Sequence, residues 1–349
     1  MGNRRDIIVI GASTGGIEAL CGLVAEVPAG LPATVFIVCH FPAGAVSNLP
    51  EILSRRGPLL ANHARDGEPA YPGQIYVAPP DLHLEVRSGT LRLTRGPREN
   101  RFRPSIDVLF RSAARAYGPR TIAVVLSGGL TDGVAGLMAV RAAGGLAVVQ
   151  DPADAIIPDL PLAALRMAGA DQVFPAAEIG RSLATLMTPA ASAGGFAMSD
   201  PVDRILQKVE SDMGEQAHNG RPGQITVLTC PECGGSLWQA NEGRLVSFRC
   251  HVGHVYAADA LLVDKTEVLE AALWTAVRMF KEKAILSHQL AAGRQAEGNR
   301  AAAERLEEDA RLAERQAAVI QTCLQTTAAA SVELGNGPAS PLPSRDPQP

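Results

Sequence analysis

A short apolar stretch that runs into a glycine-rich turn constrains this chain more than any other feature. Residues 7–10, IIVI, predict a strand buried on both faces, as in a parallel sheet. Residues 11–15, GASTG, match G-x-S-x-G, the sharp strand-to-helix turn that exposes a serine for nucleophilic attack. Ser13 is therefore a candidate nucleophile.

The same turn fits two other uses. It could cradle a phosphate in a dinucleotide-binding unit, or Ser13 could simply cap the following helix. A nicotinamide site needs an acidic residue about 20 residues after the glycines, at the end of the second strand. That strand, residues 33–39, is followed by His40, and the glycine spacing departs from G-x-G-x-x-G. The dinucleotide interpretation is weakened, whereas the helix cap stays open.

Buried strands alternate with helical stretches through the first half of the chain. Apolar, β-branched runs predict strands at 33–39, 73–78, 121–126 and 146–150, and residues 82–94 alternate as in a hairpin with its turn at Ser88-Gly89. This alternation predicts an α/β fold with a doubly wound, mostly parallel sheet.

Three polar residues follow predicted strands: Ser13, His40 and Asp132. If those strands are parallel neighbours, the three residues share the sheet edge where ligands bind in open α/β folds. A serine nucleophile needs a histidine to take its proton and a carboxylate to orient the histidine. Alone, His40 would be read as a structural hydrogen-bonding residue and Asp132 as a turn residue, but their co-occurrence favours chemistry. The order Ser, His, Asp differs from that of the α/β-hydrolases.

Several separated motifs resemble the catalytic domain of the chemotaxis protein-glutamate methylesterases. They are IGASTGGIEAL, RPSIDVLF, SGGLTDGVAGL and QDPADAIIPDLP, in the family's order over residues 6–186. The resemblance implies a triad of Ser13, His40 and Asp132 that hydrolyses γ-glutamyl methyl esters on chemoreceptor helices and also deamidates receptor glutamines. It implies methyl-accepting chemoreceptors as partners, with a sensory kinase or a separate receiver protein as further candidates. Backbone N–H groups of Thr14 and Gly129 are our candidates for holding the oxyanion.

A second interpretation is a catalytically weak regulatory or docking protein in a chemosensory or two-component pathway. The residues after His40, Phe41-Pro42-Ala43-Gly44, depart from the family's usual Met and Pro followed by a Phe-Thr pair. The chain also begins almost on its first strand, so we expect a catalytic domain without a preceding receiver domain.

A cysteine-rich segment in the second half has the spacing of a metal site. Cys230 and Cys233 form a C-x-x-C pair, and Cys250 follows at zinc-ribbon spacing. His254, with His251 as the other candidate, would complete a tetrahedral site. A redox dithiol or free buried cysteines are the alternatives, but a dithiol needs neither the third cysteine nor a histidine. Since three thiolates and an imidazole leave no open position, we expect structural zinc and no cofactor for catalysis.

Amino-acid composition and hydrophobic pattern divide the chain into five segments. From about residue 257 the pattern is helical, with Gly293 and Gly298 as breaks, and predicts a helical hairpin or coiled coil. We predict a catalytic domain at 1–190, a linker at 191–224, a zinc-ribbon-like module at 225–260, the hairpin at 261–330 and a disordered tail at 331–349.

Net charge, hydropathy and cysteine content indicate the kind of partner and the cellular compartment. A formal net charge of -4 offers no electrostatic argument for binding nucleic acid. No apolar run is long enough to insert into a membrane, and six cysteines are too sparse for a disulfide framework. We therefore expect a cytoplasmic protein.

Overall fold

The computed structural model describes residues 4–41, 45–188, 223–242 and 245–334. The chain divides into two compact units, Met1–Leu262 and Val263–Pro349. Most of the predicted linker at 191–224 and most of the predicted tail at 331–349 lie outside the described residues.

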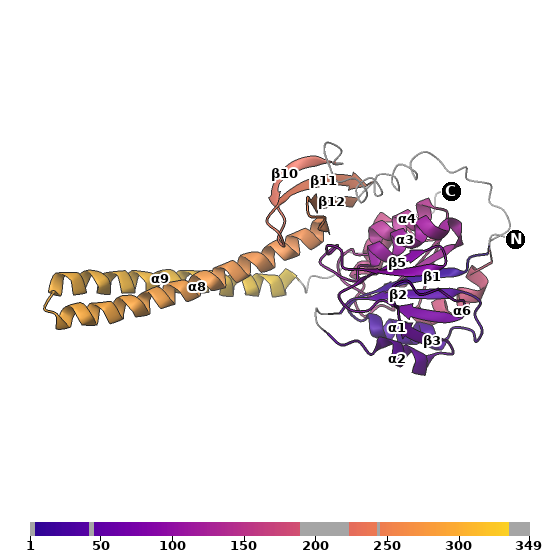
Figure 1. Cartoon of the computed structure of the whole chain (residues 1–349), viewed down its shortest axis with the longest axis horizontal. Coiled ribbons are helices and arrows are strands. Elements are labelled where there is room, and N and C mark those ends of the chain that lie inside the picture. Colours follow the sequence, from indigo (N-terminus) through magenta and orange to yellow (C-terminus); the bar gives the residue numbers. More distant parts are fainter. Residues whose placement is uncertain (1–3, 42–44, 189–222, 243–244, 335–349) are drawn as a thin grey trace, which may run out of the picture. The chain divides into compact units, whose positions relative to one another are not determined.

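A parallel sheet of seven strands, counted over the described residues, forms the centre of the first unit (Figure 1). Its order is β3-β4-β2-β1-β7-β8-β9, and every neighbouring pair is parallel. The strands are β1 (Ile7–Ala12), β2 (Thr34–Cys39), β3 (Leu60–His63), β4 (Gln74–Val77), β7 (Thr121–Val125), β8 (Leu146–Gln150) and β9 (Gln172–Phe174). The prediction of a doubly wound, mostly parallel α/β fold is confirmed.

Helices cover both faces of this sheet (Figure 1). One layer consists of α1 (Gly16–Ala25), α2 (Leu49–Arg56) and α6 (Ala176–Leu186); the other consists of α3 (Ile106–Tyr117), α4 (Val134–Ala142) and α5 (Asp159–Met167). Side chains of β1 alternate between two cores: Ile8 and Ile10 pack in the first, Ile7 and Val9 in the second. A strand buried on both faces must be apolar throughout, as the sequence of β1 is.

The direction in which the chain adds strands reverses at β1. From β1 the chain moves to β2 on one side and later returns to β7 on the other. Such a reversal is where open α/β sheets bind ligands. Residues that directly follow β1, β2 and β7 therefore meet at one edge.

A separate hairpin packs beside α3. Its strands are β5 (His83–Arg87) and β6 (Thr90–Thr94), and Arg87 pairs with Thr90 around the predicted Ser88-Gly89 turn. The backbone N–H of Val86 donates a hydrogen bond to Ser112 of α3.

A four-stranded antiparallel sheet completes the first unit. It comprises β10 (Gln224–Thr229), β11 (Ser236–Glu242), β12 (Leu245–Cys250) and β13 (Val255–Ala257) in sequence order. Leu237, Phe248, Tyr256 and Leu261 form its small core. We call β10–β13 with their connecting turns the Cys/His module, because they contain the four predicted metal ligands.

Two long helices form the predicted helical hairpin. They are α8 (Ala258–Ala296), whose first residues belong to the first unit, and α9 (Arg300–Leu334). Phe280 and Ala284 of α8 pack against Ala310 and Ala313 of α9. Gly298, with φ of 78°, lies between the helices, whereas Gly293 lies inside α8 and is no break, since a helix interior tolerates a single glycine. No described helix combines the length and apolar composition needed to cross a membrane.

Candidate active site and metal cluster

Ser13 lies directly after β1, in the turn that leads into α1. Its N–H donates to the carbonyl oxygen of Ser127 at 2.9 Å, and its own carbonyl accepts from Gly16 N–H at 2.8 Å. Gly15 has φ of 73°, and a Cβ there would lie 2.7 Å from Cβ of Ile156, so both backbone and space require glycine. The turn thus holds a half-buried Ser13 beside the segment after β7.

His40 joins the other two predicted residues. Its Nδ1 lies 3.0 Å from Ser13 Oγ, and its Nε2 lies 2.8 Å from Asp132 Oδ2. The ring is stacked on Phe102, with centroids 3.5 Å apart and planes 6° apart. In the tautomer protonated at Nε2, the imidazole donates to Asp132 and directs the Nδ1 lone pair at the Ser13 hydroxyl.

Asp132 is a buried carboxylate surrounded by donors. Its Oδ2 accepts from His40 and from Ile106 N–H at 2.7 Å. Its Oδ1 accepts from Ser105 Oγ at 2.8 Å and Asn100 Nδ2 at 3.1 Å. Burial raises the pKa of the Asp132 carboxyl, but the hydrogen bond and charge of His40, with the Ile106 and Asn100 donors, lower that pKa overall. The start of α3 adds the positive end of its dipole, so the site favours the anion.

Asp107 is a second buried acid beside Asp132. Its Oδ1 accepts from Gly136 N–H at 2.6 Å and its Oδ2 from Asn100 Nδ2 at 2.9 Å. Burial, followed by the Asp132 carboxylate, raises the pKa of Asp107 well above its usual value. The pKa values of the two neighbouring carboxyls thus shift in opposite directions.

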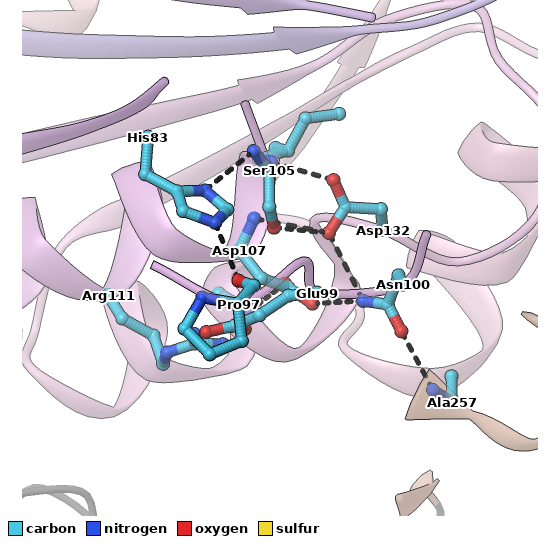
Figure 2. Close-up of polar contacts among 11 residues, drawn as sticks. His83, Pro97, Glu99, Asn100, Ser105, Asp107, Arg111, Asp132 and Ala257 are labelled. Carbon is cyan, nitrogen blue, oxygen red and sulfur yellow. Dashed lines mark hydrogen bonds and ion pairs between the residues drawn. The ribbon is translucent and has the colours of Figure 1, made fainter. Parts of the chain in front are cut away.

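Sequence reasoning did not single out the residues that support Asp132. Figure 2 shows Asn100 and Ser105 directed at its carboxylate, and His83 between Ser105 and Pro97. Ser105 directly precedes α3, a position that serine often occupies as a helix cap, but here its hydroxyl binds Asp132 and makes no cap hydrogen bond. Asn100 lies in a loop and gave no signal.

The predicted oxyanion donors flank Ser13. Thr14 is exposed, and a Cβ at Gly129 would meet no atom within 4 Å. Open space beside both backbone groups is compatible with a substrate oxygen there, and their role stays a prediction.

The four predicted metal ligands are brought together in the Cys/His module: Cys230, Cys233, Cys250 and His254. Their ligand atoms all lie within 4.8 Å of one another. Sγ of Cys233 and Cys250 are 3.6 Å apart, and His254 Nδ1 is 3.4 Å from Cys250 Sγ. Bonds of about 2.3 Å to sulfur and 2.0 Å to nitrogen put tetrahedral zinc ligands roughly 3.5–3.8 Å apart. The cluster therefore has the composition and spacing to bind a metal ion.

His254, not His251, belongs to this cluster. Its Nδ1 faces the thiols, while its Nε2 lies 3.1 Å from the Glu232 carboxylate. A carboxylate on the far nitrogen is the usual outer partner of a ligating histidine, because it fixes the tautomer. His251 is exposed.

Comparison with known proteins identifies the family. The family model for CheB methylesterase matches residues 8–183, about half of the chain. The chain belongs to the CheB methylesterase family. The CheB match includes Ser13, His40 and Asp132, and it ends before the Cys/His module and the helical hairpin.

Relatives and a solved CheB structure agree with this assignment. The chain is 41% identical over 159 residues to protein-glutamate methylesterase/protein-glutamine glutaminase 4 of Myxococcus xanthus, covering 45% of each chain. It is 41% identical over 185 residues to the corresponding protein 2 of Pseudomonas aeruginosa, covering 52% of this chain and 53% of the relative. The crystal structure of the Thermotoga maritima CheB methylesterase catalytic domain matches at a TM-score of 0.50 and 34% identity, over 52% of this chain and 98% of that one. The chain spans about half the length of the curated relatives it matches.

Proposed function

We propose that this CheB-family chain is a protein-glutamate methylesterase that hydrolyses γ-glutamyl methyl esters of chemoreceptors and releases methanol. Protein-glutamine deamidation is the proposed second activity, since the curated relatives carry both activities in their names. The observation that supports the esterase is the continuous hydrogen-bonded path from Ser13 Oγ through His40 to Asp132.

The residues suggest a two-step mechanism. His40 takes the hydroxyl proton as Ser13 Oγ attacks the ester carbonyl, and it then gives the proton to the departing methoxide. Water, activated by the same imidazole, cleaves the acyl-serine and leaves glutamate. Asp132 orients the ring and stabilises its positive charge, while Thr14 and Gly129 N–H groups receive the oxyanion.

Methanol release tests this function. We expect release from methylated chemoreceptor by the wild type and a loss of at least about a thousand-fold in kcat for Ser13→Ala, because removing a triad nucleophile disables the whole unit. Ser88→Ala, at the exposed tip of the β5–β6 hairpin, is the matched control and keeps full activity. No release from the wild type on several receptors would contradict the proposal and favour the docking protein.

The metal in the Cys/His module is proposed to be zinc. Three thiolates and one imidazole suit Zn²⁺ and leave no open position, so the ion would stabilise the fold and take no part in ester hydrolysis. Metal analysis of the purified chain is expected to find one zinc per chain, and substoichiometric zinc in Cys230→Ser. A wild-type chain without stoichiometric zinc would contradict this assignment.

The remaining proposals concern setting and organisation. We propose a cytoplasmic location, chemoreceptor helices as substrate partners, and a sensory kinase or separate receiver protein as a further contact. We also keep the division into a catalytic domain at 1–190, a linker at 191–224, a zinc-ribbon-like module at 225–260, a hairpin at 261–330 and a tail at 331–349. The hairpin offers exposed apolar side chains, among them Trp274 and Leu290, for a helical partner.

A further inference from the structure

A tight turn at Glu99–Phe102 supports two members of the proposed triad. Glu99 and Phe102 exchange backbone hydrogen bonds of 3.2 and 2.9 Å, and Asn100 and Arg101 between them have φ of 49° and 77°. These values are typical of a type I′ turn, which non-glycine residues adopt when the surroundings hold them there.

Two residues of this turn contact the active site. The Asn100 side-chain amide donates one hydrogen to Asp132 and the other to Asp107, while the Phe102 ring is stacked on His40. A movement of the turn would therefore displace the groups that fix the triad carboxylate and the imidazole together.

Strand β13 of the Cys/His module holds the Glu99–Phe102 turn in place. Asn100 N–H donates to Val255 O at 2.7 Å, and Ala257 N–H donates to Asn100 Oδ1 at 2.7 Å. Figure 2 shows Asn100 between Asp132 and Ala257. All hydrogen-bonding groups of the buried Asn100 amide are thus used, its oxygen toward the module and its nitrogen toward the two acids. Beside it, Thr131 Oγ1 donates to Asp259 at 2.9 Å.

The last residue of the metal cluster lies directly before β13. His254 immediately precedes Val255, and the Cys250 N–H donates to the His254 carbonyl at 3.0 Å while the His254 N–H points at Cys250 Sγ at 3.3 Å. Binding of an ion by the four ligands would fix the turn from Cys250 to His254. The position of Val255 against Asn100 would then be fixed as well.

We propose that Asn100 is a positioning residue that makes the geometry of the active site depend on metal binding in the Cys/His module. The proposal rests on the proposed esterase function and zinc site. The order of events is metal binding, ordering of β13, fixation of the Glu99–Phe102 turn and alignment of Asp132 and His40. In this scheme the metal acts through β13 and takes no part in the reaction itself.

Two measurements on wild type and Asn100→Ala test the coupling, each with zinc bound and after chelation. The first is kcat and KM for methanol release. The second is hydrogen exchange of the segment 97–103, whose exchangeable amides are those of residues 98–103 because Pro97 has no N–H, with the β1 amides at 7–12 as internal control. Val227→Ala, at a fully exposed position of β10 in the same module, is the matched variant and is expected to behave as wild type.

We expect chelation to lower the wild-type kcat by about 10- to 100-fold, the effect of losing a hydrogen bond to a charged group, with KM little changed. Exchange at 97–103 rises, β1 stays protected, and restoring zinc reverses both effects. With zinc bound, Asn100→Ala already has a kcat as low as that of the chelated wild type. It binds the same amount of zinc as the wild type, and chelation lowers its kcat little further.

Other outcomes overturn the coupling. One is an equal fold-loss of kcat on chelation in wild type and Asn100→Ala, and another is unchanged exchange at 97–103. A third is a simultaneous loss of protection in β1, which would mean that the metal stabilises the whole domain. Failure of the esterase is distinguishable, because the exchange measurement does not require turnover. An inactive wild type whose 97–103 amides still respond to zinc would contradict the proposed function and leave the structural coupling supported.

Discussion

Gly128→Ala would displace the nucleophile by a calculable distance. A Cβ at Gly128 would lie 2.8 Å from Ser13 Cβ and 3.0 Å from Leu160 Cδ2. Since carbon atoms pack at about 3.5 Å or more, one side must move by about 0.7 Å. Gly128 is held by Ile157 O and Leu160 N–H, at 3.0 and 2.8 Å, so the displacement falls largely on Ser13.

The displacement sets the expected magnitude. A shift of this size directed away from His40 would lengthen the 3.0 Å contact between Ser13 Oγ and His40 Nδ1 to about 3.7 Å, beyond hydrogen-bond range. Misplacement on this scale costs about 100-fold in rate, so we expect kcat to fall by that factor. Overpacking of the buried turn should also lower the free energy of unfolding by about 1–3 kcal/mol.

The assay is methanol release with kcat and KM determined separately, beside thermal unfolding. Gly22→Ala, inside α1, is the matched control, because its Cβ would meet no atom within 4 Å and a helix interior favours alanine over glycine. Wild-type kcat in Gly128→Ala, or an equal loss in Gly22→Ala, would contradict a steric displacement of Ser13.

Two further predictions follow from charge. Asp132→Asn should lower kcat by about 10⁴-fold with the fold retained by circular dichroism, because an amide no longer selects the required imidazole tautomer; near-normal turnover would show that His40 works without the carboxylate. Hydrogen bonds to Glu307, and then to Glu314, raise the pKa of His288. The protonated imidazole therefore stabilises the hairpin fully below the unfolded-state pKa of about 6.5. This contribution is lost as the pH rises through the higher folded-state pKa. NMR titration of His288 should show the raised midpoint and its return toward normal in Glu307→Gln, and an unchanged midpoint in that variant would refute the pairing.

The central strands β1, β2 and β7 were predictable because each is an almost continuous apolar run. The edge strands were not. β3 (Leu60–His63) has half of its residues exposed, and β9 (Gln172–Phe174) has only three residues, so neither produces a run or an alternation long enough to recognise. Their strand identity comes from pairing with β4 and β8, which no local pattern encodes.

Chain order explains which parts of the site were predictable. Ser13, His40 and Asp132 each follow a strand, and Cys230, Cys233, Cys250 and His254 have metal-site spacing, so local sequence points to both groups. Asn100 has no such mark, since its contact with Ala257 joins positions 157 residues apart. The opposite pKa shifts of Asp107 and Asp132 depend on burial and on which carboxyl contacts His40, and both are properties of the assembled site.

Strand order also determines how the site would be lost on heating. The strands before Ser13, His40 and the turn of Asp132 are the innermost three of the seven, β1, β2 and β7. Partial opening of a domain begins at its frayed margins and reaches the centre only on cooperative unfolding. The margins here are β3 and β9, neither of which contributes to the triad. Local melting and sequence drift at both borders of the sheet should therefore leave the three strands that carry the triad in place.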